Sequence, residues 1–148
     1  MAEFSVTHTY AATPEQVFDA WLNPQIARHF LFATPTGEMV RYELDARVGG
    51  RFTFTDRRPD MGDVLHTGEY LEIDRPHRLV FTFGVPQFNP DMTTVELDFA
   101  PASGGGCRLT LTQRQVPAEW ADRSKDGWTK IIASLEGALA GRKAEAWV

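Results

Sequence analysis

The chain has 148 residues, hydrophobic residues make up 43% of it, and its formal net charge is −5. This length is enough for one folded domain, residues 1–148, with a substantial buried core. The acidic balance and the lack of a Lys/Arg cluster argue against a dedicated nucleic-acid binder and against docking on anionic lipid.

The first predicted elements are a strand and two short helices. Alternating residues predict a strand over residues 4–10 with one face buried. A capping box at residues 13–16, with a proline at the first helical position, predicts that a helix follows. That helix is expected to bury Val17, Phe18, Trp21 and Leu22. Asn-Pro at residues 23–24 ends it, and a second short helical turn is expected at residues 26–29.

A run of strands follows, separated by segments rich in Gly, Pro and Asp. Alternating apolar residues predict strands at 40–44, 52–54, 64–73, 79–83, 95–99 and 109–111. Residues 56–63 are interpreted as a polar loop. In residues 64–73 the inner face is ambiguous, because His66 and Tyr70 have the opposite parity to Leu71 and Ile73. We expect a bulge at Gly68 to switch the face.

The last segment is predicted to be a long helix that begins near residue 119. Apolar side chains recur in it at spacings of three and four, and so share one face. They are Trp128, Ile131, Ile132, Leu135, Ala138 and Leu139. Short strands joined by tight turns favour an antiparallel sheet, which this helix would cover. The pattern therefore predicts an α+β fold.

Five different motifs follow one another along the chain, at residues 10–21, 48–54, 68–82, 106–112 and 127–135. Together they resemble the helix-grip superfamily of START-like (SRPBCC) domains, and most of all the bacterial relatives of the heat-shock-protein ATPase activator. The resemblance implies a curved antiparallel sheet of about seven strands wrapped around the long C-terminal helix, with two short helices after the first strand. It also implies a hydrophobic pocket between sheet and helix. One departure is His-Phe-Leu-Phe at residues 29–32, where such proteins often carry tryptophan.

We expect the pocket to bind a small hydrophobic molecule, because a bent sheet and a straight helix leave a wedge that large rings line without closing. The residues expected to line it are Tyr42, Phe52, Phe54, His66, Tyr70, Phe81, Phe83, Trp128, Ile132 and Leu135. The resemblance does not imply one activity, since relatives include lipid and steroid carriers, polyketide cyclases and a chaperone-activating module.

Two other functions stay open. A cyclase-like or hydrolase-like enzyme would use His8, Tyr42, His66 or Tyr70 in the same pocket, and it requires a buried His–acid or Tyr–His contact. A chaperone or stress-response interaction module would instead show an exposed apolar patch and a collapsed pocket. Association of identical chains into a homodimer, through a sheet edge or a loop face, is a further open possibility.

Other chemistries lack their sequence signals. The four histidines, at positions 8, 29, 66 and 77, have no metal-ligand spacing, so we expect no metal and no cofactor. Cys107 is the only cysteine and has no evident base beside it, which predicts a small buried residue rather than a nucleophile. No apolar run has the length of a membrane span, and no signal peptide opens the chain, so a cytoplasmic location is expected.

Overall fold

The computed structural model describes residues 1–140. Its strands are β1 (Ala2–Tyr10), β2 (Glu38–Leu44), β3 (Arg51–Arg58), β4 (Gly62–Asp74), β5 (Arg78–Phe83), β6 (Thr93–Pro101) and β7 (Cys107–Val116). Its α-helices are α1 (Pro14–Leu22), α2 (Pro24–Phe30) and α3 (Ala121–Leu139), and short 3₁₀ helices η1 (Ser103–Gly105) and η2 (Ala118–Trp120) flank β7.

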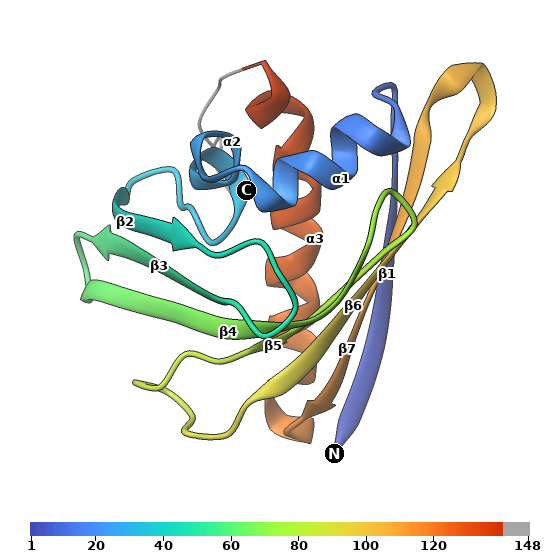
Figure 1. The fold of residues 1–148 in the computed structure, drawn as a ribbon. Coiled ribbons are helices and arrows are strands. Elements are labelled where there is room, and N and C mark those ends of the chain that lie inside the picture. The colour runs from blue at the N-terminus through green and yellow to red at the C-terminus, as the bar shows by residue number, and fades with distance from the viewer. Residues whose placement is uncertain (141–148) are drawn as a thin grey trace.

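The seven strands form one antiparallel sheet in the order β1-β7-β6-β5-β4-β3-β2. Figure 1 shows this sheet curving around α3, with α1 and α2 gathered near the end of α3 that is farther from its start. Helix α3 contacts both α2 and the edge strand β1. The predicted α+β helix-grip architecture is therefore confirmed.

Local sequence signals set the first two helices. The Thr13 hydroxyl accepts a hydrogen bond from the Gln16 amide at 3.2 Å, and the Gln16 side chain accepts one from the Thr13 amide at 2.9 Å. This is the predicted capping box. Asn23 ends α1 in an extended conformation and caps α2 through a 3.0 Å bond from the Gln25 amide. The second helical turn is thus a seven-residue helix.

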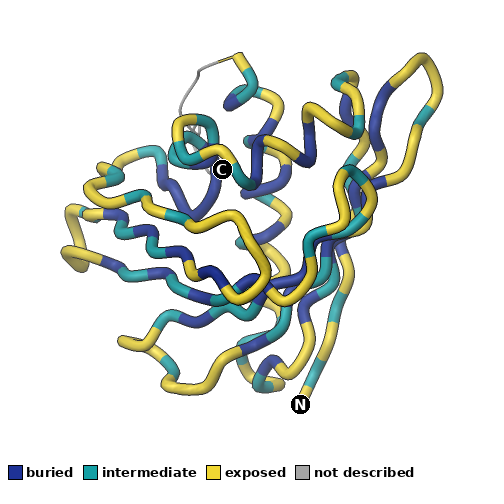
Figure 2. The backbone as a smooth tube through the Cα atoms, viewed as in Figure 1, coloured by how far each residue is buried: buried dark blue, intermediate teal, exposed yellow. Residues whose placement is uncertain are grey.

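The core lies between the concave face of the sheet and α3 (Figure 2). The apolar stripe of α3 is buried as predicted, except that Leu139 at its end is only partly buried. Each buried Ile or Leu contributes about 1.5–3 kcal/mol of transfer free energy before entropy is subtracted. None of the helices within residues 1–140 is both long and apolar enough to cross a membrane.

Two predictions about β3 and β4 were wrong in detail. The expected loop at 56–63 is shorter, because β3 runs to Arg58 and β4 starts at Gly62, and Asp56 is fully buried. The bulge in β4 lies at Leu71 rather than Gly68, so Tyr70 points inward and Leu71 outward. Gly68 instead allows close packing, since a Cβ there would lie 1.8 Å from the Thr82 carbonyl oxygen.

A second bulge changes the edge strand β2. The register shifts between Met39 and Arg41, which turns Val40 toward solvent and Met39 toward the core. The alternation predicted from Val40 through Leu44 therefore holds only for Tyr42 and Leu44. Bulges are common at sheet edges, where they disturb the ladder that would otherwise pair with another chain.

Candidate functional site

A pocket of about 260 Å³ opens beside the first half of α3. One wall comes from strands β3 to β7, another from η2 and α3, and the loop between β5 and β6 borders it. Its lining residues are Phe32, Arg58, His66, Phe83, Gly84, Val85, Phe88, Asn89, Asp91, Thr93, Gln113, Val116, Pro117, Trp120, Arg123, Ser124, Gly127, Trp128 and Ile131. Because its α3 residues run from Arg123 to Ile131, the pocket lies toward the start of α3.

Aromatic rings form the inner wall of this pocket. The Phe32 ring stacks on the His66 ring at 4.5 Å and on the Phe83 ring at 4.9 Å, with interplanar angles of 8° and 5°. The Trp128 ring meets Phe32 and Phe83 edge-on, at 5.6 and 5.5 Å. Stacked and edge-to-face pairs at these distances add to the free energy of area burial and restrict ring rotation. The wall is consequently apolar and rigid.

Phe32 occupies a special backbone position. Its φ is 62°, in the left-handed region that costs an L-residue about 1–2 kcal/mol. The residue is nevertheless buried, and its ring also contacts Phe52 and Phe54. These contacts offset the backbone strain and hold the ring at the inner end of the pocket.

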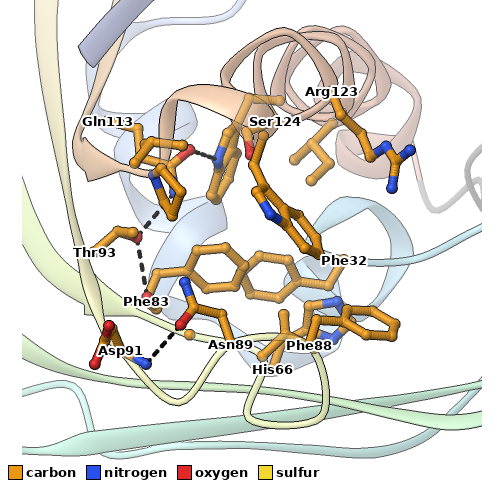
Figure 3. Close-up of a pocket in the computed structure, with 18 of the residues that line it drawn as sticks. Phe32, His66, Phe83, Phe88, Asn89, Asp91, Thr93, Gln113, Arg123 and Ser124 are labelled. Atoms are coloured by element: carbon orange, nitrogen blue, oxygen red, sulfur yellow. Dashed lines mark hydrogen bonds between the residues drawn. The ribbon is translucent and has the colours of Figure 1, made fainter. Parts of the chain in front are cut away.

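A chain of hydrogen bonds crosses the pocket wall from α3 to β5 (Figure 3). The Trp128 indole N–H donates to the side-chain oxygen Oε1 of Gln113 at 2.9 Å. The side-chain nitrogen Nε2 of Gln113 donates to the Thr93 hydroxyl at 2.9 Å. The Thr93 hydroxyl donates to the Phe83 carbonyl oxygen at 3.0 Å. Because an indole can only donate, the orientation of the Gln113 amide is fixed. The chain thus satisfies buried polar groups and anchors Trp128.

His66 is the titratable group in the inner wall. It is 5% exposed, and its Nδ1 lies 3.3 Å from the Phe54 carbonyl oxygen. Burial, helped by the positive charge of Arg58, lowers the pKa of His66 from 6.5 to about 3. The imidazole is therefore neutral at physiological pH.

A buried carboxylate holds Arg58 at the edge of the pocket. Asp56 is 0% exposed, and its Oδ2 accepts hydrogen bonds from the Thr34 hydroxyl at 2.7 Å and from Arg58 Nε at 3.0 Å. The bond to Thr34 also ties the segment between α2 and β2 to β3. Asp56 therefore positions both Arg58 and the segment that carries Phe32.

Aromatic and polar side chains share the outer part of the pocket. The exposed Phe88, in the loop between β5 and β6, lies 6.4 Å from Trp120 of η2, centroid to centroid. The Arg123 guanidinium lies 5.8 Å from the same Trp120 ring. Asn89 accepts a hydrogen bond from the Asp91 amide at 3.0 Å, which shapes the loop (Figure 3).

The structure brings three of the ten expected lining residues to the pocket: His66, Phe83 and Trp128. Six others pack in the closed core: Phe52, Phe54, Tyr70, Phe81, Ile132 and Leu135. Tyr42 lies partly buried at the core's edge, with the Arg28 guanidinium 5.4 Å from its ring centre. The open part of the wedge is thus nearer the start of α3 than the sequence analysis predicted.

Sequence reasoning missed three features of the site. His-Phe-Leu-Phe at residues 29–32 departs from the family pattern, but nothing in it signals that Phe32 turns back into the pocket. Gln113 sits at an inward position of β7, where a polar residue among leucines was an available signal. Asp56 follows Phe52 and Phe54 at the alternating positions of β3 that face the core. Its polar neighbours led to the prediction of a loop there.

The groups expected for acid–base chemistry are His8, Tyr42, His66 and Tyr70, and two further buried titratable groups are Tyr10 and Cys107. The Tyr10 hydroxyl donates to the Ile132 carbonyl oxygen at 2.5 Å, and burial raises its pKa. His8 lies on the partly exposed side of β1, with Nε2 3.9 Å from the Glu136 carboxylate. Cys107 is buried, which raises the pKa of its thiol to about 11. Within residues 1–140, His66 and Tyr70 have no hydrogen bond to an acidic side chain or to each other.

No group of three or more His, Cys, Asp or Glu side chains within residues 1–140 is arranged to hold a metal ion. The site is therefore described by its rings, the neutral His66, and the charged side chains of Arg58, Asp91 and Arg123.

Several solved structures share this fold. A protein from Arthrobacter aurescens, solved by NMR, superposes with a TM-score of 0.80 at 19% identity, covering 96% of this chain and 88% of that one. A protein from Nitrosomonas europaea gives a TM-score of 0.78 at 20% identity, covering 94% of each chain. At these identities the likeness shows the fold alone.

Three further comparisons bear on the family. An HSP90 activator from Plasmodium falciparum is similar at 26% identity with a TM-score of 0.70, covering 95% of this chain and 97% of that one. No curated protein matches the sequence at a significant level. A family model described as Activator of Hsp90 ATPase homolog 1-like protein matches residues 11–140, which is most of the chain. The chain therefore belongs to the family of Activator of Hsp90 ATPase homolog 1-like proteins.

Proposed function

We propose that the protein binds a small hydrophobic molecule, without a metal or covalent cofactor, in the pocket beside the start of α3. The observation that carries this proposal is a pocket of about 260 Å³ whose inner wall is made of Phe32, His66, Phe83 and Trp128. Ligand sites are typically concave, mostly apolar and few in number. The volume lies just below the usual range of about 300–1,000 Å³, so the ligand is small.

The same wall explains why the pocket stays open. Trp128 is fixed by its bond to Gln113, and Phe32 is fixed by five aromatic neighbours. Closing the space would require these side chains to leave their partners and unpair buried polar groups, at a cost of about 1–3 kcal/mol for each group. A preformed pocket of this kind binds with little loss of side-chain entropy.

Gly127 offers a direct test. It lines the pocket from α3, and a Cβ built on it meets no atom within 4 Å. We expect Gly127→Leu to fill the pocket and to abolish the fluorescence gain of an anilinonaphthalene probe that the wild-type protein binds. The fold should persist, since leucine is favoured over glycine in a helix by up to about 0.8 kcal/mol.

The matched control is Ala133→Leu, on the exposed side of the same helix. This variant should keep the wild-type probe signal. Equal signals from both variants would show that the probe binds elsewhere and would reject the pocket as the binding site. Native mass spectrometry of the freshly purified protein would then identify the class of any retained molecule.

A second candidate is an interaction module that acts on a chaperone. It is favoured by the family and by the likeness to a structure named as an HSP90 activator. This function needs a docking surface rather than a pocket. The test of this function is the ATPase rate of an Hsp90-type chaperone. The rate should rise when the wild-type protein is added, and it should rise equally with Gly127→Leu.

A further inference from the structure

The inner wall of the pocket carries His66, whose ring nitrogen Nε2 has no hydrogen bond from a donor within residues 1–140. His66 Nδ1 contacts the Phe54 carbonyl oxygen at 3.3 Å, and a carbonyl can only accept. The ring proton must therefore lie on Nδ1. A neutral imidazole carries one N–H, so Nε2 presents a lone pair. The backbone groups that interact with the ring, the carbonyls of Phe54 and Val64, are both acceptors, so neither can donate to Nε2.

The surroundings of His66 leave few ways to satisfy that lone pair from within the protein. The ring is 5% exposed and stacks on Phe32. The nearby polar groups of Trp128, Gln113 and Thr93 are committed to each other and to the Phe83 carbonyl. The Arg58 Nε–H is committed to Asp56. Since these neighbours are committed, a water molecule or a bound ligand can supply the donor to Nε2.

We propose that the ligand is a flat aromatic alcohol of one or two rings, whose hydroxyl donates a hydrogen bond to His66 Nε2. This inference rests on the proposed function, because it assumes that the pocket binds a hydrophobic molecule. The volume of about 260 Å³ exceeds the roughly 150 Å³ in which a cavity lined by Leu, Ile and Phe takes up benzene. The nearly parallel rings of Phe32 and Phe83 offer flat surfaces against which such a body packs.

The chemistry of Nε2 also excludes other head groups from the inner pocket. An ether or ketone has no proton to donate and would place two acceptors against each other. A carboxylate has the same defect and would carry a charge into a largely apolar wall, where the nearest cation, Arg58, already pairs with Asp56. A hydroxyl that replaces an ordered water regains the hydrogen bond that the water made.

The test compares 2-naphthol with 2-methylnaphthalene, which has nearly the same shape but no donor. Dissociation constants are measured for the full chain by calorimetry or fluorescence. Replacing His66 with phenylalanine should lower the preference for 2-naphthol, expressed as the ratio of the two constants, by about three- to tenfold. Phe83→Leu is the control, because it should weaken both compounds and leave the ratio unchanged.

The outcomes separate this inference from the proposed function. If both compounds bind and the ratio is the same in wild type and His66→Phe, the hydroxyl inference is wrong while the pocket proposal stands. If neither compound binds, both are wrong. Should His66→Phe fail to fold, the wild-type protein alone decides with 2-methoxynaphthalene. This ether must bind more weakly than 2-naphthol, and equal affinity would overturn the inference.

Discussion

At the scale of single residues, His66 links the pocket to the pH dependence of stability. In the folded protein its pKa is lowered to about 3, mainly by burial and also by Arg58, whereas the unfolded chain titrates near 6.5. Between these values the unfolded state binds a proton that the folded state does not. Stability from this group is therefore complete above about pH 6.5 and falls as the pH decreases toward 3.

We predict that the free energy of unfolding decreases by about 2 kcal/mol between pH 7 and pH 5 through His66 alone. Urea unfolding at a series of pH values measures it. His66→Gln should flatten the profile in this interval, and His77→Gln, at an exposed turn, should leave the profile unchanged. The comparison is confined to pH values above 5 because many carboxylates titrate below it. A slope that survives His66→Gln would contradict the assignment.

At the scale of elements, the loop between β5 and β6 borders the pocket. The Gln87 side chain fastens this loop to β4, because it accepts a hydrogen bond from the Leu65 amide at 2.9 Å and donates one to the Asp63 carbonyl oxygen at 2.7 Å. Phe88 in the same loop reaches toward Trp120. The loop is thus held at both sides of the opening.

Removing the two Gln87 hydrogen bonds should change the dissociation rate of a bound ligand more than the free energy of unfolding. Gln87 is exposed, so Gln87→Ala loses about 0.5–1.5 kcal/mol for each hydrogen bond at most. We predict a severalfold faster dissociation of the anilinonaphthalene probe in stopped-flow experiments, together with faster amide hydrogen exchange in residues 84–91. Gln25→Ala in α2 is the control. Unchanged dissociation rates would mean that ligands enter by another path.

These elements also show which structural features can be predicted from the sequence. The capping box, the strand alternation and the stripe on α3 all arise from local periodicity, and each was predicted within a few residues. The bulges at Val40 and Leu71 were not located, since a bulge depends on how the neighbouring strand pairs. The inward turn at Phe32 depends on a positive φ that tertiary contacts impose. Long-range packing, which local patterns do not encode, decided these cases.

The whole molecule explains why the pocket is at one end. Near α1 and α2, the rings of Trp21, Phe30 and Phe81 pack together and fill the space between sheet and helix. Within the described residues, no second α-helix covers the sheet toward the start of α3 (Figure 1), where the β5–β6 loop and η2 border the pocket. Most of the residues expected to line a pocket were therefore assigned to the filled end. The wedge was anticipated, but which end of it stays open depends on where the short helices lie.

A ligand that occupies this open end should stabilise the whole fold. Binding to the folded state alone adds about 2.7 kcal/mol when the free ligand is at 100 times its dissociation constant. For a domain of this size, each kcal/mol raises Tm by about 2–4 °C, so 2-naphthol at that level should raise Tm by about 5–10 °C. Gly127→Leu should show no such rise, and Ala133→Leu should show all of it. If the wild-type Tm is unmoved by a saturating ligand while the ATPase rate of a chaperone responds to the protein, the docking surface rather than the pocket carries the function.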